Sequence, residues 1–251
     1  MKKKKFIKPS KQKLLNLFKK NFLNSIYIFF LGALSSYSLP PYNYFIINFI
    51  TFSLFFIFLF NKKKKLCSNK SFFKYGWCFG FGYFLFSLYW IVISLTFDES
   101  FKLLIPVAII LLPAFLGVFY GLAIYLYSTF YSKNIVSSFL IYSILFGLIE
   151  FIRGSIFTGF PWNLIAFSFA NSIYFIQILS IIGTYSFNLI CISLFTLPAL
   201  FILRESKKEV IVCFFFIIVS VCFLIFGNVK YNKFNSLESV KNSYMIKAIS
   251  S

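Results

Sequence analysis

The stretch "LLIPVAIILLPAFLGVFYGLAIYLYSTFY", residues 103–131, contains no charged side chain. A helix needs about 20 apolar residues to cross the hydrocarbon core of a bilayer, so this run is long enough to span a membrane. The whole chain is 60% hydrophobic and holds 40 phenylalanines, whereas soluble domains are about 45–50% apolar. No stretch alternates polar and apolar residues as the strands of a membrane barrel do. The predicted fold class is therefore an all-α integral membrane protein.

Similar apolar runs recur along the chain and predict about seven transmembrane helices. Residues 1–21 form a basic tail, residues 22–229 the seven-helix membrane domain, and residues 230–251 a polar tail. Pro40 and Pro41 predict a turn between the first two spans. The predicted spans are residues 22–39, 42–60, 75–97, 103–131, 135–151, 172–203 and 210–229.

The net charge of +19 is confined to short blocks between the apolar runs. Such blocks set membrane orientation and contact anionic lipid, so we interpret them as a topology signal and not as a nucleic-acid surface. With a cytoplasmic N-terminus, residues 61–74 form a basic inside loop and the outside loops carry only Lys102 and Arg153. The C-terminal tail is then periplasmic.

Few residues suit metal or nucleophilic chemistry. The chain has no histidine and five cysteines, none of them in a CxxC pair. This composition argues against a zinc site, and we expect neither a metal nor a cofactor. It also excludes a histidine-based nucleophile system within these residues.

The stretch "EFIRGSIFTGFPWN", residues 150–163, places two rare charges beside strong helix breakers. Glu150 and Arg153 are three residues apart, so on a helix they share a face and can pair. We expect a helix end followed by an irregular loop at the outer membrane surface. Two interpretations stay open: an ion pair at the interface with Trp162 as an aromatic anchor, or a pocket that admits lipid from the outer leaflet.

A second cluster, "GWCFGFGYFLFSLYWIVIS", covers residues 76–94. Its glycines Gly76, Gly80 and Gly82 would let a neighbouring helix approach closely. Tyr89 and Trp90 lie toward the outer end of this span. Either they belong to an aromatic belt at the interface, or they contact a lipid substrate.

Four stretches together resemble the bacterial apolipoprotein N-acyltransferases. They are "LSSYSLPPYN" (34–43), "FGFGYFLFSLYW" (79–90), "EFIRGSIFTGFPWN" (150–163) and "QILSIIGTYSFNLI" (177–190). The resemblance implies an inner-membrane enzyme that transfers an acyl chain from a phospholipid to the N-terminal diacylglyceryl cysteine of a lipoprotein. It also implies that the mouth of the substrate cleft is shaped by Glu150, Arg153, Phe160, Pro161 and Trp162, together with Tyr89 and Trp90.

In that family the catalytic cysteine, glutamate and lysine belong to a nitrilase-like domain that follows the seventh helix. Here the stretch "YMIKAIS" (244–250) resembles only the first strand of that domain. We therefore expect residues 230–251 to be a linker and the first strand of a truncated domain, and the chain alone to be inactive. The alternatives are a membrane anchor or assembly subunit for a separately encoded catalytic half, or a small transporter.

Overall fold

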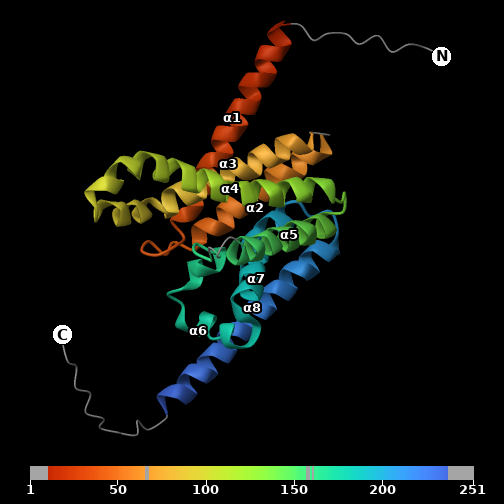
Figure 1. Cartoon of the computed structure of the whole chain (residues 1–251). Helices are drawn as coiled ribbons and strands as arrows, with labels where there is room; N and C mark the ends of the chain where they lie inside the picture. Colours follow the sequence, from red (N-terminus) through yellow and green to blue (C-terminus); the bar gives the residue numbers. More distant parts are fainter. Residues whose placement is uncertain (1–10, 66–67, 157–158, 160, 237–251) are drawn as a thin grey trace.

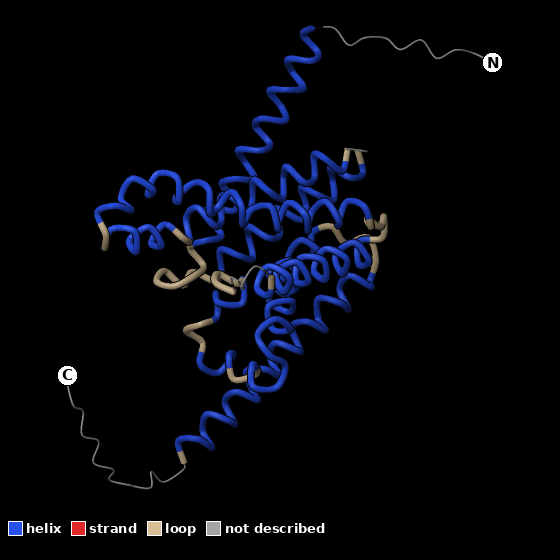
Figure 2. The backbone as a smooth tube through the Cα atoms, in the orientation of Figure 1, coloured by secondary structure: helices blue, strands red, loops and turns tan. Residues whose placement is uncertain are grey.

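The computed structural model describes residues 11–65, 68–156, 159 and 161–236 of the chain. Within these ranges every regular element is a helix, which confirms the all-α prediction (Figure 2). The predicted strand at residues 244–250 and the candidate residue Phe160 lie outside the described residues. The same is true of the first ten residues of the basic tail.

The helices follow one another with short connections, and α1 and α8 extend from opposite ends of the bundle (Figure 1). In chain order they are α1 (Lys11–Ser36), α2 (Ile46–Lys64), α3 (Asn69–Ser87), η1 (Tyr89–Thr96), η2 (Glu99–Leu104), α4 (Ile105–Thr129), α5 (Ile135–Ser155), η3 (Ile165–Phe169), α6 (Ile173–Ile176), α7 (Leu179–Ile202) and α8 (Lys207–Asn235).

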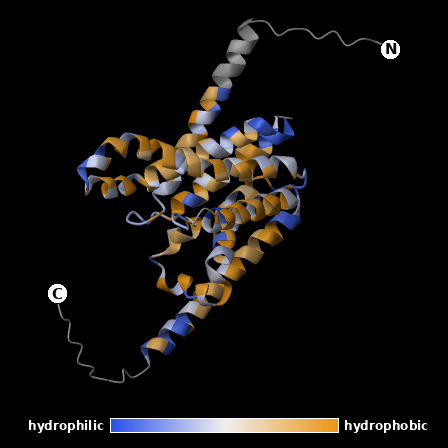
Figure 3. Cartoon of the chain, in the orientation of Figure 1, coloured by the Kyte–Doolittle hydropathy of each residue, from blue (hydrophilic) through white to orange (hydrophobic). Residues whose placement is uncertain are grey.

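Five helical segments of the described chain are long and apolar enough to cross a membrane: α2, η2 with α4, α5, α7 and α8. The pair α3–η1 would add a sixth span, bent by 49°. The described apolar part of α1, Asn21–Ser36, is shorter than the others. The colouring of Figure 3 shows that hydrophobic residues predominate along these helices. The protein is thus a multi-pass membrane protein, while the number of seven spans and their orientation stay predictions.

Some predicted boundaries were wrong. The run 172–203 is not one helix, because α6 ends at Ile176 and α7 begins at Leu179. Inside α7, Gly183 has φ 74° and ψ 169°, and a glycine adopts this backbone without a Cβ clash. The run 75–97 is likewise divided at Leu88, between α3 and η1. An apolar run shows that a segment enters the membrane but does not show where its helix breaks.

The predicted basic loop at residues 61–74 is also mostly helical. Helix α2 continues to Lys64 and α3 begins at Asn69. The amino group of Lys64 lies 4.7 Å from the ring centre of Phe60, and that of Lys63 lies 5.5 Å from the ring of Phe72. Lysines at a helix C-terminus also interact favourably with the helix dipole, so these charges extend the helix instead of ending it.

Helix α3 lies between α1 and α4, and its glycines make both contacts possible. A Cβ on Gly82 would lie 2.2 Å from the carbonyl oxygen of Phe29 in α1. A Cβ on Gly76 would lie 2.3 Å from the carbonyl oxygen of Tyr120 in α4. Neither distance leaves room for a side chain, which confirms the predicted close approach of helices at these glycines.

Candidate functional site

The site begins near the C-terminal end of α5, where Glu150 and Arg153 form an ion pair. The Arg153 Nη2 atom lies 2.8 Å from Glu150 Oε2, and both side chains are completely buried. The guanidinium also lies 5.1 Å from the ring centre of Phe84 on α3. The predicted pairing is therefore confirmed, but the charges are enclosed by protein and do not reach the membrane surface. Enclosure makes the pairing essential, since an unpaired buried charge is strongly destabilising.

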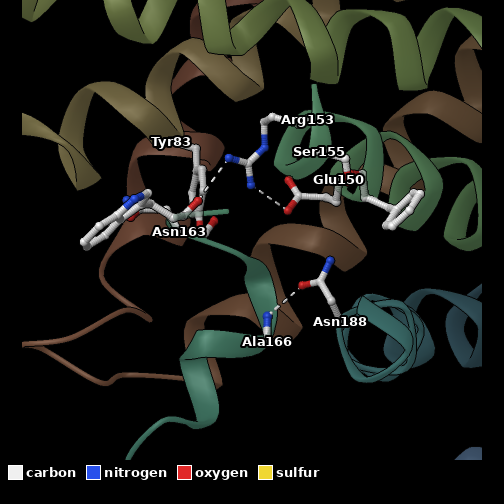
Figure 4. Close-up of polar contacts among 9 residues, drawn as sticks. Tyr83, Glu150, Arg153, Ser155, Asn163, Ala166 and Asn188 are labelled. Atoms are coloured by element: carbon white, nitrogen blue, oxygen red, sulfur yellow. Dashed lines mark hydrogen bonds and ion pairs between the residues drawn. The ribbon is translucent and has the colours of Figure 1, made fainter. Parts of the chain in front are cut away.

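Arg153 also connects α5 to the irregular segment that follows it. Its Nη1 atom donates a hydrogen bond to the backbone carbonyl of Trp162 at 3.0 Å (Figure 4). We refer to residues 161–172, which include η3, as the Trp162 segment. The ion pair thus orients a guanidinium that holds the beginning of this segment.

Helix α3 holds the same segment from another side. The Tyr83 hydroxyl donates to the carbonyl of Asn163 at 2.9 Å, and the side-chain amide of Asn163 donates to the carbonyl of Ser87 at 3.2 Å. Asn163 has φ 56°, in the left-handed region that asparagine tolerates better than most residues. These contacts fix the direction of the chain directly after Trp162.

Two buried asparagines hold η3, although neither was predicted from the sequence as a site residue. The Asn188 Oδ1 atom on α7 accepts a hydrogen bond from the backbone N–H of Ala166 at 2.9 Å (Figure 4). On α2, Asn48 Nδ2 donates to the hydroxyls of Ser38 and Ser168, each at 2.8 Å. Both asparagines are completely buried. A signal was available, because a polar side chain within an apolar span almost always faces the protein interior.

A cavity of about 410 Å³ lies beside the Trp162 segment. It is bounded by the turn between α1 and α2, the junction of α3 with η1, and the Trp162 segment itself. The rings of Trp90 and Trp162 lie 5.8 Å apart at its wall. Its lining includes Pro40, Pro41, Tyr42, Tyr89, Trp90, Trp162, Asn163 and Phe167. Three segments that are distant in the sequence therefore form one pocket.

The candidate residues take different places around this cavity. Tyr89, Trp90 and Trp162 line it, and each is partly exposed. Glu150 and Arg153 do not line it. Arg153 instead contacts the Trp162 segment through its hydrogen bond to the Trp162 carbonyl. Pro161 is exposed and is not part of the lining.

The described lining of the cavity carries no charged side chain. Its phenols can offer hydrogen bonds, and the neighbouring Tyr89 raises the pKa of the Tyr42 phenol above its ordinary value. Tyr42 is therefore a neutral hydrogen-bonding group at physiological pH. An apolar pocket with a few neutral polar groups suits an uncharged or aliphatic ligand.

The described residues around this cavity include neither a group of metal ligands nor a cysteine thiol. In the described part of the chain, no three His, Cys, Asp or Glu residues lie close enough to hold a metal ion. Cys78, Cys191 and Cys213 are buried, Cys222 is exposed on α8, and none of these four lines the cavity. Cys67 lies outside the described residues.

These features define a helical integral membrane protein with an aromatic-walled pocket beside a buried ion pair. Residues 31–197 match the family model described as the apolipoprotein N-acyltransferase N-terminal domain. This range includes all four stretches that carry the resemblance. The chain belongs to the apolipoprotein N-acyltransferase family.

Curated relatives agree with this assignment. The chain is 34% identical to the apolipoprotein N-acyltransferase of Rhizobium etli (strain CIAT 652) over 184 residues, which is 70% of this chain and 34% of the relative. It is 32% identical to the protein of the same name from Brucella melitensis biotype 1 over 183 residues, covering 68% of this chain and 33% of the relative. The chain thus spans about a third of the length of the curated relatives it matches.

Proposed function

We propose that this polypeptide forms the membrane part of an apolipoprotein N-acyltransferase in the bacterial inner membrane. The enzyme would transfer an acyl chain from a phospholipid to the N-terminal diacylglyceryl cysteine of a lipoprotein. The observation that carries this proposal is the cavity of about 410 Å³. Three of the four family-like stretches meet there, although they are far apart in the sequence.

In this proposal the cavity receives an aliphatic part of a lipid substrate. Trp90 and Trp162 supply broad apolar walls, and Tyr42 and Tyr89 supply hydroxyl groups. Glu150 and Arg153 act as positioning residues, because Arg153 donates a hydrogen bond to the backbone carbonyl of Trp162 in the cavity wall and neither side chain is part of the described lining. Because this wall is already ordered, binding of the ligand costs less conformational entropy.

We further propose that these 251 residues do not transfer acyl groups by themselves. Three of the four described cysteines are buried in the helical bundle and none lines the cavity. A thiolate nucleophile needs an accessible and polar environment, which a buried helix position does not provide. In this proposal the nucleophile comes from a nitrilase-like region that acts together with this membrane part.

A chimera tests the proposal directly. Residues 1–236 would replace the corresponding membrane region of the Rhizobium etli relative, and acylation of a diacylglyceryl lipopeptide would be measured in membranes. We expect activity in the chimera, a loss of at least tenfold in Trp90→Ala/Trp162→Ala, and little change in the control Trp77→Phe. Trp77 is a suitable control because its indole N–H donates to the Ala114 carbonyl between α3 and α4, away from the cavity.

The proposal is contradicted if the chimera inserts into the membrane but does not acylate the lipopeptide, while the Rhizobium etli relative is active in the same assay. Equal activity in the double variant and the control would contradict the role of the cavity. The unfused polypeptide should be inactive in the same assay. If it co-purifies with a separate nitrilase-like polypeptide and this pair is active, the chain is the membrane subunit of a two-chain enzyme.

A further inference from the structure

Helix α8 is attached to the bundle near its two ends and is loosely held between them. Only 11% of its apolar window is buried, and its buried residues are Glu209, Cys213 and Gly227. The Cys213 thiol lies 3.8 Å from the carbonyl oxygen of Leu197 on α7. Gly227 lies 14 residues later, about 21 Å along the helix. The position of the C-terminal part of α8 therefore depends on what Gly227 and its neighbours contact.

Gly227 contacts the backbone of α6. A Cβ at this glycine would lie 1.7 Å from the carbonyl oxygen of Tyr174, which leaves no room for a side chain. The ring of Tyr174 also packs edge-on against the ring of Tyr231, with centres 5.3 Å apart. Figure 1 shows α6 beside α8 before the end of α8 leaves the bundle. A small residue at position 227 thus permits the close approach of the two helices.

Lys230 adds a polar contact in the next turn of α8. Its ammonium group donates a hydrogen bond to the Ser180 hydroxyl, which in turn donates to the carbonyl of Gln177. Ser180 lies in the first turn of α7, before the break at Gly183. The end of α8 is therefore joined to α6 by close packing and to the start of α7 by a hydrogen bond.

Helix α6 is itself fixed to the wall of the cavity. It begins at Ile173, directly after the Trp162 segment. Phe175 of α6 is buried, and its ring centre lies 4.6 Å from that of Phe169 in the Trp162 segment and 5.3 Å from that of Phe187 on α7. Because α6 is packed from both sides, the end of α8 and the Trp162 segment share one support.

We propose that Gly227 and Lys230 are positioning residues, which hold the C-terminal end of α8 at a fixed distance and direction from the cavity. In the chimera described above, the nitrilase-like region of the relative begins directly after residue 236. Reacting atoms must approach to about 3–3.5 Å, and a misplacement of about 1 Å can cost roughly 10²-fold in rate. The catalytic consequence rests on the proposed function, whereas the fixed position of α8 does not.

Double electron–electron resonance on the full chain measures this position. Nitroxide labels would be attached through p-acetylphenylalanine in place of Phe234 on α8 and Leu148 on α5, which are both exposed. We expect Gly227→Leu to shift the mean distance by about 2 Å or more, because helix axes lie 8–10 Å apart depending on the side chains between them. The matched control is Val229→Leu, an exposed position on the same helix, which should leave the distance unchanged.

Lys230 is tested by its own series. Lys230→Met removes the hydrogen bond to Ser180, so the distance distribution should become at least twice as wide. Lys230→Arg keeps a donor at this position and should retain the original width. Lys233→Met, at an exposed lysine one turn later, is the matched control. Should Gly227→Leu fail to fold, the Lys230 series decides the position of α8 alone.

The chimera tests the catalytic consequence. Gly227→Leu should lower kcat at least tenfold and change the KM for the phospholipid less than twofold, because the lining of the cavity is untouched. Val229→Leu should alter neither. An unchanged distance distribution in folded Gly227→Leu and Lys230→Met would overturn the fixed position of α8. A shifted distance with unaltered kcat would overturn the positioning role. An inactive parent chimera would contradict the proposed function alone, and the distance measurement would still decide whether α6 fixes α8.

Discussion

The guanidinium of Arg153 donates a hydrogen bond to the backbone carbonyl of Trp162, 3.0 Å away and nine residues later in the chain. The same guanidinium pairs with the buried carboxylate of Glu150. A charged pair at the end of α5 thereby determines where an aromatic wall of the cavity stands.

Removing one partner of the buried ion pair should destabilise the protein strongly. Arg153→Met leaves Glu150 buried without its partner, and we expect the free energy of unfolding to fall by about 3–5 kcal/mol. Glu150→Gln/Arg153→Met should recover much of this loss, because no unpaired charge remains. Unfolding in mixed micelles would measure both. The control is Lys102→Met, which removes the exposed pair with Glu99 and should cost about 0–1 kcal/mol. An equal fall in the free energy of unfolding in Arg153→Met and Lys102→Met would show that the buried pair stabilises the protein no more than the exposed pair does.

Removing the Asn48 amide should loosen the Trp162 segment while the helices remain. Asn48→Ala leaves the hydroxyls of Ser38 and Ser168 without this partner, at a cost of about 1–3 kcal/mol. We expect faster hydrogen exchange in the amides of residues 161–172. Asn232→Ala, an exposed change on α8, should leave this exchange unaltered. Unchanged exchange in Asn48→Ala would mean that the other contacts suffice to hold the segment.

A side chain at Gly82 should separate α1 from α3. Gly82→Leu places carbon atoms where the Phe29 carbonyl now lies, so the helices must move apart. Overpacking of this kind costs roughly 1–3 kcal/mol, and a leucine should reach the upper end of this range. A disulfide between cysteines introduced on the two helices would report the distance. The matched control is Lys74→Leu, two turns earlier on α3, where the side chain is exposed. Unaltered crosslinking in Gly82→Leu would refute the close approach.

The single aspartate of the chain should titrate below its ordinary range. The hydroxyl and backbone N–H of Ser100 lower the pKa of Asp98. Because the folded-state pKa is depressed, the resulting stabilisation is present above the unfolded-state pKa and is lost as the pH falls through the folded-state value. In Ser100→Ala we expect the pKa of Asp98 to rise toward its ordinary value. Carbon-13 labelling of aspartate gives one carboxyl resonance to follow by NMR. Ser94→Ala serves as the control, since its hydroxyl bonds to the Ile91 carbonyl. An identical titration in Ser100→Ala would show that the Ser100 hydroxyl is not a cause of the lowered pKa, since the variant keeps the backbone N–H.

Part of the site could be predicted from the spacing and type of residues that are close together in the sequence. The spacing of Glu150 and Arg153 predicted their ion pair, because residues three apart on a helix share a face. The glycines of α3 predicted close helix contacts for an equally local reason, the absence of a side chain. Asn48 and Asn188 were missed, although asparagines in apolar spans are a local signal too.

The sequence by itself determined that this is a helical membrane protein, since the length and apolarity of a run are sufficient for a span. It also located the stretches that carry the family resemblance. Only the tertiary structure decided that the ion pair is buried, that α7 breaks at Gly183, and that Trp90 meets Trp162. Contacts between distant residues depend on which helices pack together and at what angle. Hydrophobic patterning does not encode these relationships, because every face of a membrane helix, whether it meets lipid or protein, can be apolar.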